Sequence, residues 1–364
     1  MPASKIPTLV LGATGYVGGA VLTRFLADSS IMDHLEITIY IRSAEKAKVF
    51  EEQFAIKAAV GEYDDYEKIE KLAEEFSIVV TVGSDVEKSI FEALIRGMKT
   101  HRDKTGERPI SIHTTGTACL VDFAHFMGIS VSEQITSDLD ADALEKIPPH
   151  APHRAVDLLF LDADKAGYIR NLFVIPPTIF GRLTGPLADA GLCMLHSQQI
   201  PALVRAAVER GRVAMVGNGE GLWGHVHVDD VSDLFALLVR TAATSPDRLA
   251  FGRDGYYFAE AGEYSHRALA ERVGAALCEL GAVADPAPVG YMTDEEIAAH
   301  AHAERFLVAS GTNARCRAER SRLLGWEATA KSSIEEMWAS IKPEAELLVM
   351  EMGREKARRE ATAA

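Results

Sequence analysis

The stretch LGATGYVGG, residues 11–19, joins a short apolar run to a segment of helical period. Gly12 permits a tight turn, Gly15 lets a pyrophosphate approach the backbone, and Gly18 lets the helix pack closely on the strand. The spacing is G-x-x-G-x-x-G, one residue longer than G-x-G-x-x-G, and the helix that follows directs its N-terminus at the phosphates. We predict a dinucleotide-binding turn made by Gly12, Thr14, Gly15, Tyr16 and Val17. The alternative is a glycine-rich connection without a ligand, which the flanking elements disfavour.

Runs rich in β-branched residues alternate with helical segments through the first half of the chain, which is the pattern of βαβ units. The predicted strands are Thr8–Leu11, Glu36–Ile41, Ile56–Val60, Ile78–Val82, Ile110–Thr114 and Asn171–Ile175. The predicted helices are Val17–Ala27, one capped by Ser43, one from an Asp65 cap to Phe76, and Val86–Lys99. Strands of such continuous apolar character are covered by helices on both faces. We therefore predict an α/β fold with a doubly wound parallel Rossmann sheet.

The pattern changes after Gly181 to isolated helices and short strands, which predicts a smaller, mainly helical substrate domain. We assign residues 1–181 and 223–250 to the Rossmann domain, residues 182–222 and 251–342 to the substrate domain, and residues 343–364 to a helical, charged tail. Thr293 with Glu296, and Ser332 with Glu335, have capping-box spacing and predict helix starts. The acidic segment Ser137–Pro152 predicts an exposed loop.

The composition restricts the class of partner. Acidic residues outnumber basic residues 53 to 38, and the net charge of −15 disfavours nucleic acid and anionic lipid as partners. The four cysteines have no spacing suited to zinc, so we expect no metal site and a reducing compartment. No apolar run reaches the ~18 residues of a membrane helix, and no signal peptide is evident. The expectation is a cytoplasmic protein that binds a small-molecule substrate and is able to form a homodimer.

The end of the second predicted strand indicates which dinucleotide binds. An acidic residue there would accept a hydrogen bond from the ribose of NAD, but the strand ends in Arg42, with Lys46 one turn into the next helix. Two cations at this place suit a 2′-phosphate, so we predict NADP(H) as the cofactor. The alternative is that Arg42 and Lys46 are ordinary solvated charges.

Further stretches fall at the ends of predicted strands and late in the chain: GEYDD at 61–65, VGS at 82–84, PPTIFG at 176–181, HVHVDDV at 225–231 and LLGW at 323–326. With the turn at 12–18, they resemble the short-chain dehydrogenase/reductase superfamily, in its extended, NAD-dependent epimerase/dehydratase-like branch. The resemblance implies that Tyr63 approaches the adenine, Val82 and Gly83 the adjoining ribose, and Pro176 and Thr178 the nicotinamide. We expect His225 and His227 to serve packing and capping.

The chain departs from the family at its catalytic residues. Active reductases of the family carry Tyr-x-x-x-Lys on one helix, but no tyrosine here is followed four residues later by lysine, and His153 and Asp157 hold that spacing. Thr115, with Thr114 as second choice, aligns with the family's serine or threonine. We predict that His153 donates a proton, that Asp157 orients the His153 side chain, and that Thr115 binds the substrate oxygen. The alternative is that His153 caps the helix and Asp157 meets Arg154 or solvent.

These features together predict an enzyme, an NADP(H)-dependent oxidoreductase of atypical short-chain type. It would reduce a carbonyl or activated double bond of a small, fairly apolar metabolite. Two other classes fit: a non-catalytic NADP(H)-binding redox sensor similar to NmrA-like regulators, and a lyase or isomerase that retains bound cofactor. The missing tyrosine and lysine favour the sensor, and the large C-terminal region favours an enzyme.

Overall fold

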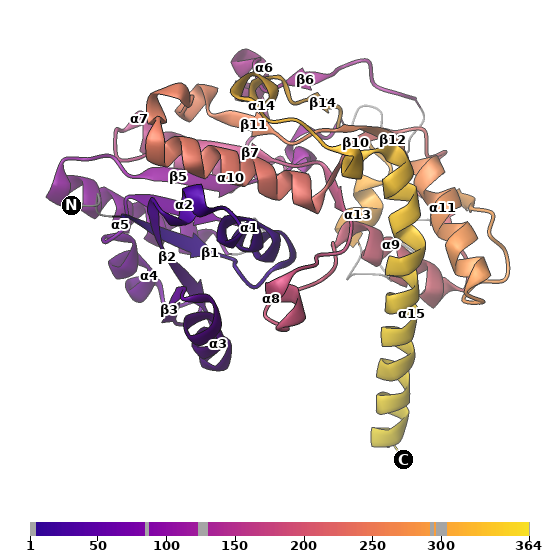
Figure 1. Cartoon of the computed structure of the whole chain (residues 1–364). Helices are drawn as coiled ribbons and strands as arrows, with labels where there is room; N and C mark the ends of the chain where they lie inside the picture. Colours follow the sequence, from indigo (N-terminus) through magenta and orange to yellow (C-terminus); the bar gives the residue numbers. More distant parts are fainter. Residues whose placement is uncertain (1–4, 84–86, 123–129, 292–294, 296–303, 364) are drawn as a thin grey trace.

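A seven-stranded parallel sheet forms the centre of the computed structural model, which describes residues 5–83, 87–122, 130–291, 295 and 304–363 (Figure 1). Its strands lie in the order β11-β7-β5-β4-β1-β2-β3. Their bounds are β1 Ile6–Leu11, β2 Leu35–Ile41, β3 Lys57–Val60, β4 Ile78–Thr81, β5 Ile110–Thr114, β7 Arg170–Ile175 and β11 Tyr256–Phe258. The order reverses between β1 and β4, and open α/β sheets bind ligands at such a reversal. The predicted doubly wound sheet is confirmed.

Helices bury the apolar strands of this sheet. The helix bounds are α1 Tyr16–Leu26, α2 Ser29–Met32, α3 Ala44–Phe54, α4 Tyr66–Ala73, α5 Lys88–Thr105, α7 Arg154–Lys165 and α10 Val228–Thr244. Helix α1 packs against α10, and α5 packs against α4 and α7. The predicted caps form, because Ser43 accepts a hydrogen bond from the N–H of Lys46 and Asp65 accepts one from Lys68. Helix α4 ends earlier than predicted, and the predicted helix start at Val86 lies outside the described residues.

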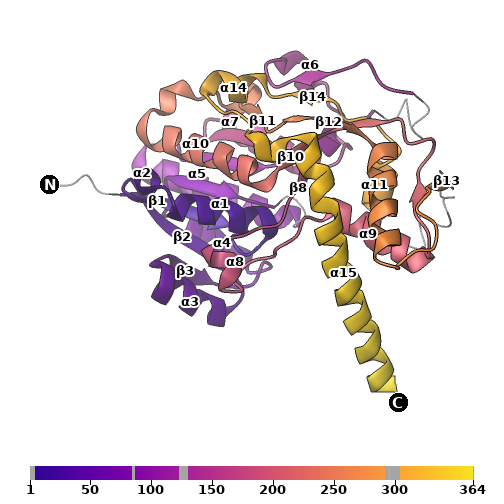
Figure 2. The ribbon, with the colours of Figure 1, turned by 45° about the vertical axis from the view of Figure 1, so that its right-hand side comes forward.

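The second region is built on a three-stranded sheet in the order β12-β10-β8, with a long C-terminal helix beside it (Figure 2). Its main elements are β8 Thr178–Phe180, α9 Gln199–Arg210, β10 Leu222–His227, β12 Gly262–Ser265, α11 His266–Glu279, α13 Glu304–Ala309 and α15 Ile334–Ala363. Two small parallel pairs complete it, β9 Ala214–Met215 with β13 Val289–Tyr291, and β6 Thr136–Ser137 with β14 Cys316–Arg317. Within the described part of the chain, no helix is long and apolar enough to cross a membrane.

The segment Ser137–Pro152 is largely exposed, as predicted, but it is not a plain loop. It contains a short helix, α6 Ala141–Glu145, and a fully buried carboxylate, Asp138. Asp138 accepts backbone hydrogen bonds from Phe258 at 3.0 Å and Arg320 at 2.7 Å. One of its acidic residues, Asp138, therefore joins three segments of the chain, which a composition argument does not detect.

Two other predictions need correction. Helix α15 is capped by Ser333, which accepts a hydrogen bond from the N–H of Glu336, because Ser332 is engaged with His227 and Asp230 instead. Strand β11 lies within residues 251–342 but belongs to the large sheet, so the two regions interleave there. The predicted capping box of Thr293 and Glu296 lies outside the described residues.

Candidate cofactor and active site

The turn between β1 and α1 has the geometry of a phosphate-binding site. Gly12 has a φ of 86°, and a Cβ there would lie 1.8 Å from the carbonyl oxygen of Val82. A Cβ on Gly18 would lie 1.9 Å from the carbonyl oxygen of Gly12, whereas Gly15 faces open space apart from that oxygen at 3.2 Å. Helix α1 has no side-chain cap and no acidic residue in its first turn. Its first-turn N–H groups, on Tyr16 and Val17, therefore suit a pyrophosphate.

The residues predicted to meet the adenine end lie after β2, β3 and β4. The Arg42 guanidinium lies over the Tyr63 ring, 5.1 Å from its centroid, at the exposed end of β2. Lys46 Nζ donates to the carbonyl oxygen of Leu192 at 3.0 Å, so part of its hydrogen-bonding capacity is used inside the protein. Val82 is buried, and Gly83 is exposed with open space around its Cα. The residues present thus fit a dinucleotide along this edge.

Sequence reasoning missed the segment 182–197, which we call the covering loop. Its Met194 N–H donates to the carbonyl oxygen of Thr14 at 3.1 Å, and its Cys193 packs on Gly19, where a Cβ would lie 2.5 Å from the Cys193 Cβ. Just before the loop, the carbonyl of Gly181 accepts a hydrogen bond from the Tyr16 hydroxyl. The loop therefore lies against the phosphate turn. Gly19, the second glycine of the Gly18–Gly19 pair, was the sequence signal for this loop, because it marks a place where another segment approaches α1 closely.

Thr115 and Asp157 meet at the carboxyl end of β5. Thr115 Oγ1 donates to Asp157 Oδ2 at 3.2 Å, and both side chains are buried. The second carboxylate oxygen, Oδ1, is buried without a hydrogen-bond partner among the described residues. Burial raises the pKa of Asp157 to about 7, although the hydrogen bond from Thr115 and the charge of Arg154 favour the ionised form. Asp157 thus holds the Thr115 hydroxyl, a contact that the predicted role of orienting His153 did not include.

His153 is the N-cap residue of α7 and has a left-handed backbone, with a φ of 66°. Its side chain makes no capping hydrogen bond to the helix. The ring lies against Gly116 instead, where a Cβ would be 3.2 Å from Nε2 and 3.9 Å from the carbonyl oxygen of Pro176. The structure therefore brings His153 beside the strand ends that carry Thr115 and Pro176. This position is compatible with the predicted role of His153 as a proton donor, which stays a prediction.

Pro176 and Thr178 follow β7 on the same edge of the sheet. The Pro176 carbonyl accepts a hydrogen bond from the N–H of Thr117, which ties the two strand ends together. Thr178 Oγ1 is engaged with Gln199 at 3.0 Å and with the Tyr264 hydroxyl at 2.8 Å, so it contributes to a buried network. Of the two, Pro176 is the residue with a backbone hydrogen bond to the segment that follows Thr115.

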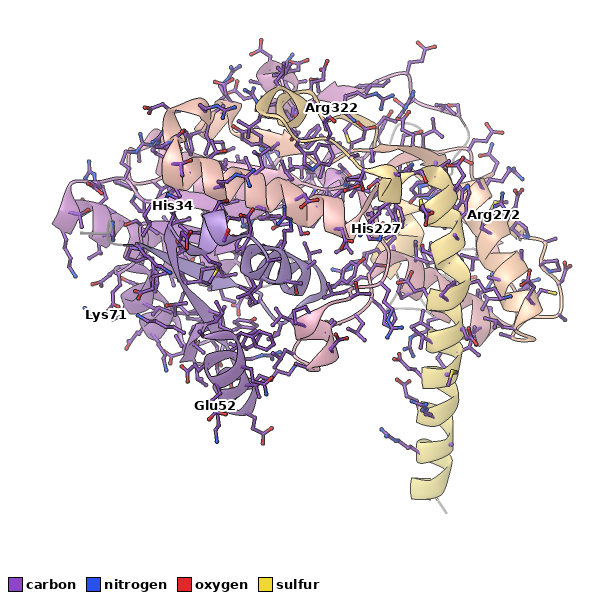
Figure 3. All side chains as sticks on the ribbon, viewed as in Figure 1. His34, Glu52, Lys71, His227, Arg272 and Arg322 are labelled. Atoms are coloured by element: carbon purple, nitrogen blue, oxygen red, sulfur yellow. The ribbon has the colours of Figure 1, made fainter. Side chains whose placement is uncertain are left out.

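The two histidines of the segment 225–231 have the packing and capping roles that were expected. His227 Nδ1 accepts the N–H of Asp229 at 3.1 Å and caps α10, and Figure 3 shows His227 between that helix and the start of α15. His225 is buried against Phe180, with ring centroids 6.0 Å apart. Burial lowers the pKa of His225 to about 4, so the ring is neutral at physiological pH.

Comparison with known families matches residues 12–117 to a family described as NAD(P)H-binding. The chain contains an NAD(P)H-binding Rossmann domain. The matched residues begin at Gly12 and extend past Thr115, so they include the phosphate turn and the edge that carries Arg42 and Tyr63. The predicted dinucleotide-binding domain is confirmed. The individual residues predicted to contact the dinucleotide, and the preference for NADP(H) over NAD(H), stay predictions.

The NAD(P)H-binding domain and the second region together have the fold of extended epimerases and dehydratases. The UDP-glucose 4-epimerase of Thermotoga maritima superposes with a TM-score of 0.57 at 14% identity, covering 95% of this chain and 100% of that chain. The dTDP-glucose 4,6-dehydratase DesIV of Streptomyces venezuelae gives a TM-score of 0.61 at 15% identity, with 93% and 96% covered. These likenesses confirm the predicted architecture.

One curated relative matches along most of its length. The oxidase ucsJ of Acremonium sp is 26% identical over 350 residues, which cover 93% of this chain and 97% of that protein. The match therefore extends over both regions of this chain.

Proposed function

We propose that the chain is an NADP(H)-dependent oxidoreductase that reduces a carbonyl or activated double bond of a small, fairly apolar metabolite. The observation that most supports this proposal is the hydrogen bond of Thr115 to Asp157 at the carboxyl end of β5, with the His153 ring against the neighbouring Gly116. A hydroxyl and two candidate proton donors thus remain although the tyrosine and lysine of the family are missing. The name of the Acremonium relative, an oxidase, supports redox chemistry.

Thr115 is proposed to bind the substrate oxygen, because its hydroxyl belongs to the strand end beside Pro176. When bound, the reduced nicotinamide supplies a hydride. Gly12 and Gly15 would provide the turn for the pyrophosphate, the first-turn N–H groups of α1 would hold it, and Arg42 would bind the 2′-phosphate. The proton for the substrate oxygen comes from a group next to Thr115, and the reaction class does not depend on which one supplies it.

The test is turnover of NADPH and of NADH by the purified protein with a panel of aldehydes, ketones and enones. Consumption of NADPH that depends on one of these substrates is the expected result. The matched control is Thr114→Val, because Thr114 is the neighbouring threonine and was the second choice for this role. Turnover that Thr115→Val removes and Thr114→Val keeps would support the assignment. Equal loss in both variants would contradict it.

The missing Tyr-x-x-x-Lys motif favours a second candidate, an NADP(H)-binding redox sensor. A sensor would bind NADPH and NADP⁺ with different affinities and would turn over none of the panel. Tight NADPH binding without turnover, unchanged in Thr115→Val, would replace the reductase with the sensor.

A further inference from the structure

We infer that Asp157 is the source of the proton for the substrate oxygen, and that Thr115 carries the proton between them. The inference rests on the proposed carbonyl reduction and deepens it. It differs from the sequence-based assignment, in which His153 donates the proton and Asp157 only orients it. The observation behind it is the contact of Asp157 Oδ2 with Thr115 Oγ1 at 3.2 Å. Thr115 is the residue that we propose touches the substrate oxygen.

The protonation state of Asp157 decides what Thr115 offers to a substrate. A hydroxyl has one hydrogen to donate. If Asp157 is ionised, it attracts that hydrogen, and Thr115 presents a lone pair, which repels a carbonyl oxygen. If Asp157 is protonated, its O–H donates to Thr115 and leaves the Thr115 hydrogen free for the substrate. Reduction therefore requires the protonated carboxyl.

The surroundings of Asp157 favour the protonated form at neutral pH. The side chain is 1% exposed and its Oδ1 lacks a hydrogen-bond partner among the described residues, so the ionised form loses the solvation that water would give. Arg154, one turn earlier on α7, is the cation that opposes this, and its Nη1 donates to the Tyr256 hydroxyl at 2.9 Å. The effect of burial outweighs it. Burial raises the pKa of Asp157 to about 7.

Arg154 and the nearby His153 aside, three titratable groups on neighbouring elements are neutral. Cys119, from the 3₁₀ turn after β5, and Tyr256, from β11, both have their pKa raised by burial, Tyr256 to about 12. His113, on β5, has its pKa lowered by burial to about 3, with its Nδ1 bonded to Thr81 at 2.7 Å. None of these three carries a charge that would fix Asp157 in its ionised form.

The proposed step balances in atoms and electrons. The carbonyl carbon gains the hydride, and the electron pair of its π bond moves to the oxygen. That oxygen takes the hydrogen of Thr115 Oγ1, and Thr115 takes the proton of Asp157. An alcohol, an oxidised cofactor and an Asp157 carboxylate result. After the product leaves, water that enters the site returns a proton to Asp157 through Thr115.

The test is the pH dependence of kcat/KM for NADPH-dependent reduction in the full-length protein. The unmodified protein should show a plateau below about pH 7 and a tenfold decrease per pH unit above it, because the acid form is the active one. Asp157→Asn should lower kcat by roughly 10²–10⁴-fold and remove this pH limb. Asp162→Asn, an exposed position on the same helix, is the matched control and should change neither.

Two further variants keep the test decisive if Asp157→Asn does not fold. Thr115→Ser keeps a hydroxyl and should keep the pH limb, whereas Thr115→Val should lose activity. His153→Ala should retain the limb. If His153→Ala abolishes the pH limb, the inference is wrong and His153 is the donor. Absence of turnover with every carbonyl in the unmodified protein would contradict the proposed function itself.

Discussion

At the scale of single residues, Arg42 is the residue predicted to decide the preference for NADP(H) over NAD(H). Arg42 stands at the end of β2, where a hydrogen-bond acceptor for the ribose of NAD would otherwise be expected, and its guanidinium lies over Tyr63 at 5.1 Å. A planar cation held on an aromatic ring is placed for bidentate contact with a phosphate. Lys46 is the weaker contributor, because its ammonium also bonds Leu192.

Arg42→Asp should invert the cofactor preference. The unmodified protein should bind NADPH at least tenfold more tightly than NADH, because only NADPH offers Arg42 a 2′-phosphate. The aspartate would repel that phosphate and accept a hydrogen bond from the ribose of NADH. Titration by nicotinamide fluorescence measures both affinities. Equal affinities for the two cofactors in the unmodified protein would show that Arg42 and Lys46 are ordinary surface charges.

Glu344 should make stability depend on pH. It is buried on α15 and accepts a hydrogen bond from Ser197 at 3.1 Å, and burial raises its pKa to about 7. A folded pKa above the unfolded one means that stability falls as the pH rises from about 4 to about 7, and that this contribution is constant at higher pH. Glu344→Gln should therefore raise the melting temperature at pH 8 and have little effect at pH 4. Glu346→Gln, at an exposed position of the same helix, should leave both values unchanged.

At the scale of elements, α7 carries Asp157 and begins after His153, and the covering loop lies against the phosphate turn. The N-cap of helix α7 is a strained residue, since His153 adopts a φ of 66°, which residues other than glycine rarely take. The covering loop is held on α1 by the Met194 N–H and by Cys193 against Gly19. Each arrangement has a test that does not depend on knowing the substrate.

His153→Gly should stabilise the protein by about 1 kcal/mol relative to His153→Ala, because glycine adopts positive φ without a Cβ penalty. Ala155→Gly, two residues later in the first turn of α7, should instead destabilise by up to about 1 kcal/mol, since glycine is less favourable than alanine in a helix. Urea unfolding gives both values. Equal stability of His153→Gly and His153→Ala would mean that the backbone at 153 is not strained.

Gly19→Val should displace the covering loop. The new Cβ would lie 2.5 Å from the Cys193 Cβ and 3.0 Å from Leu183 Cδ2, distances that these side chains cannot accommodate without moving. We expect trypsin to cleave after Arg182, which is exposed at the start of the loop, several-fold faster than in the unmodified protein. Gly353→Val, where no atom lies within 4 Å of the added Cβ, is the control. Unchanged cleavage at Arg182 would mean that the loop does not rest on α1.

At the scale of the whole molecule, the C-terminal helix completes the second region and then leaves it. Met337, Ile341, Ala345 and Leu348 recur on one face of α15 and are buried in the core of that region. The remainder of the helix projects from the body of the protein (Figures 1 and 2). The predicted tail boundary at residue 343 therefore falls inside the packed part of the helix.

Removal of residues 353–364 should leave the melting temperature almost unchanged. An ion pair joins Glu355 of this segment to Arg205 at 3.2 Å, with half of the Glu355 side chain exposed, and such surface pairs contribute little. Ile341→Ala, by contrast, should cost about 2–5 kcal/mol, because it leaves a cavity in the core. Thermal melting of the two variants compares them. A large loss in the truncated chain would assign the projecting turns a structural role.

The sequence by itself was enough to predict the large sheet, the phosphate turn and the placement of Arg42. These features depend on neighbours within about twenty residues: an apolar run, three glycines at a fixed spacing and the residue that ends the next strand. Only the tertiary structure showed that Asp157 meets Thr115, that the covering loop lies on Gly19, and that β11 and Asp138 join the two regions. Each of those contacts joins residues dozens to hundreds apart in the chain, and neither periodicity nor local spacing encodes which distant side chain will arrive at a given strand end.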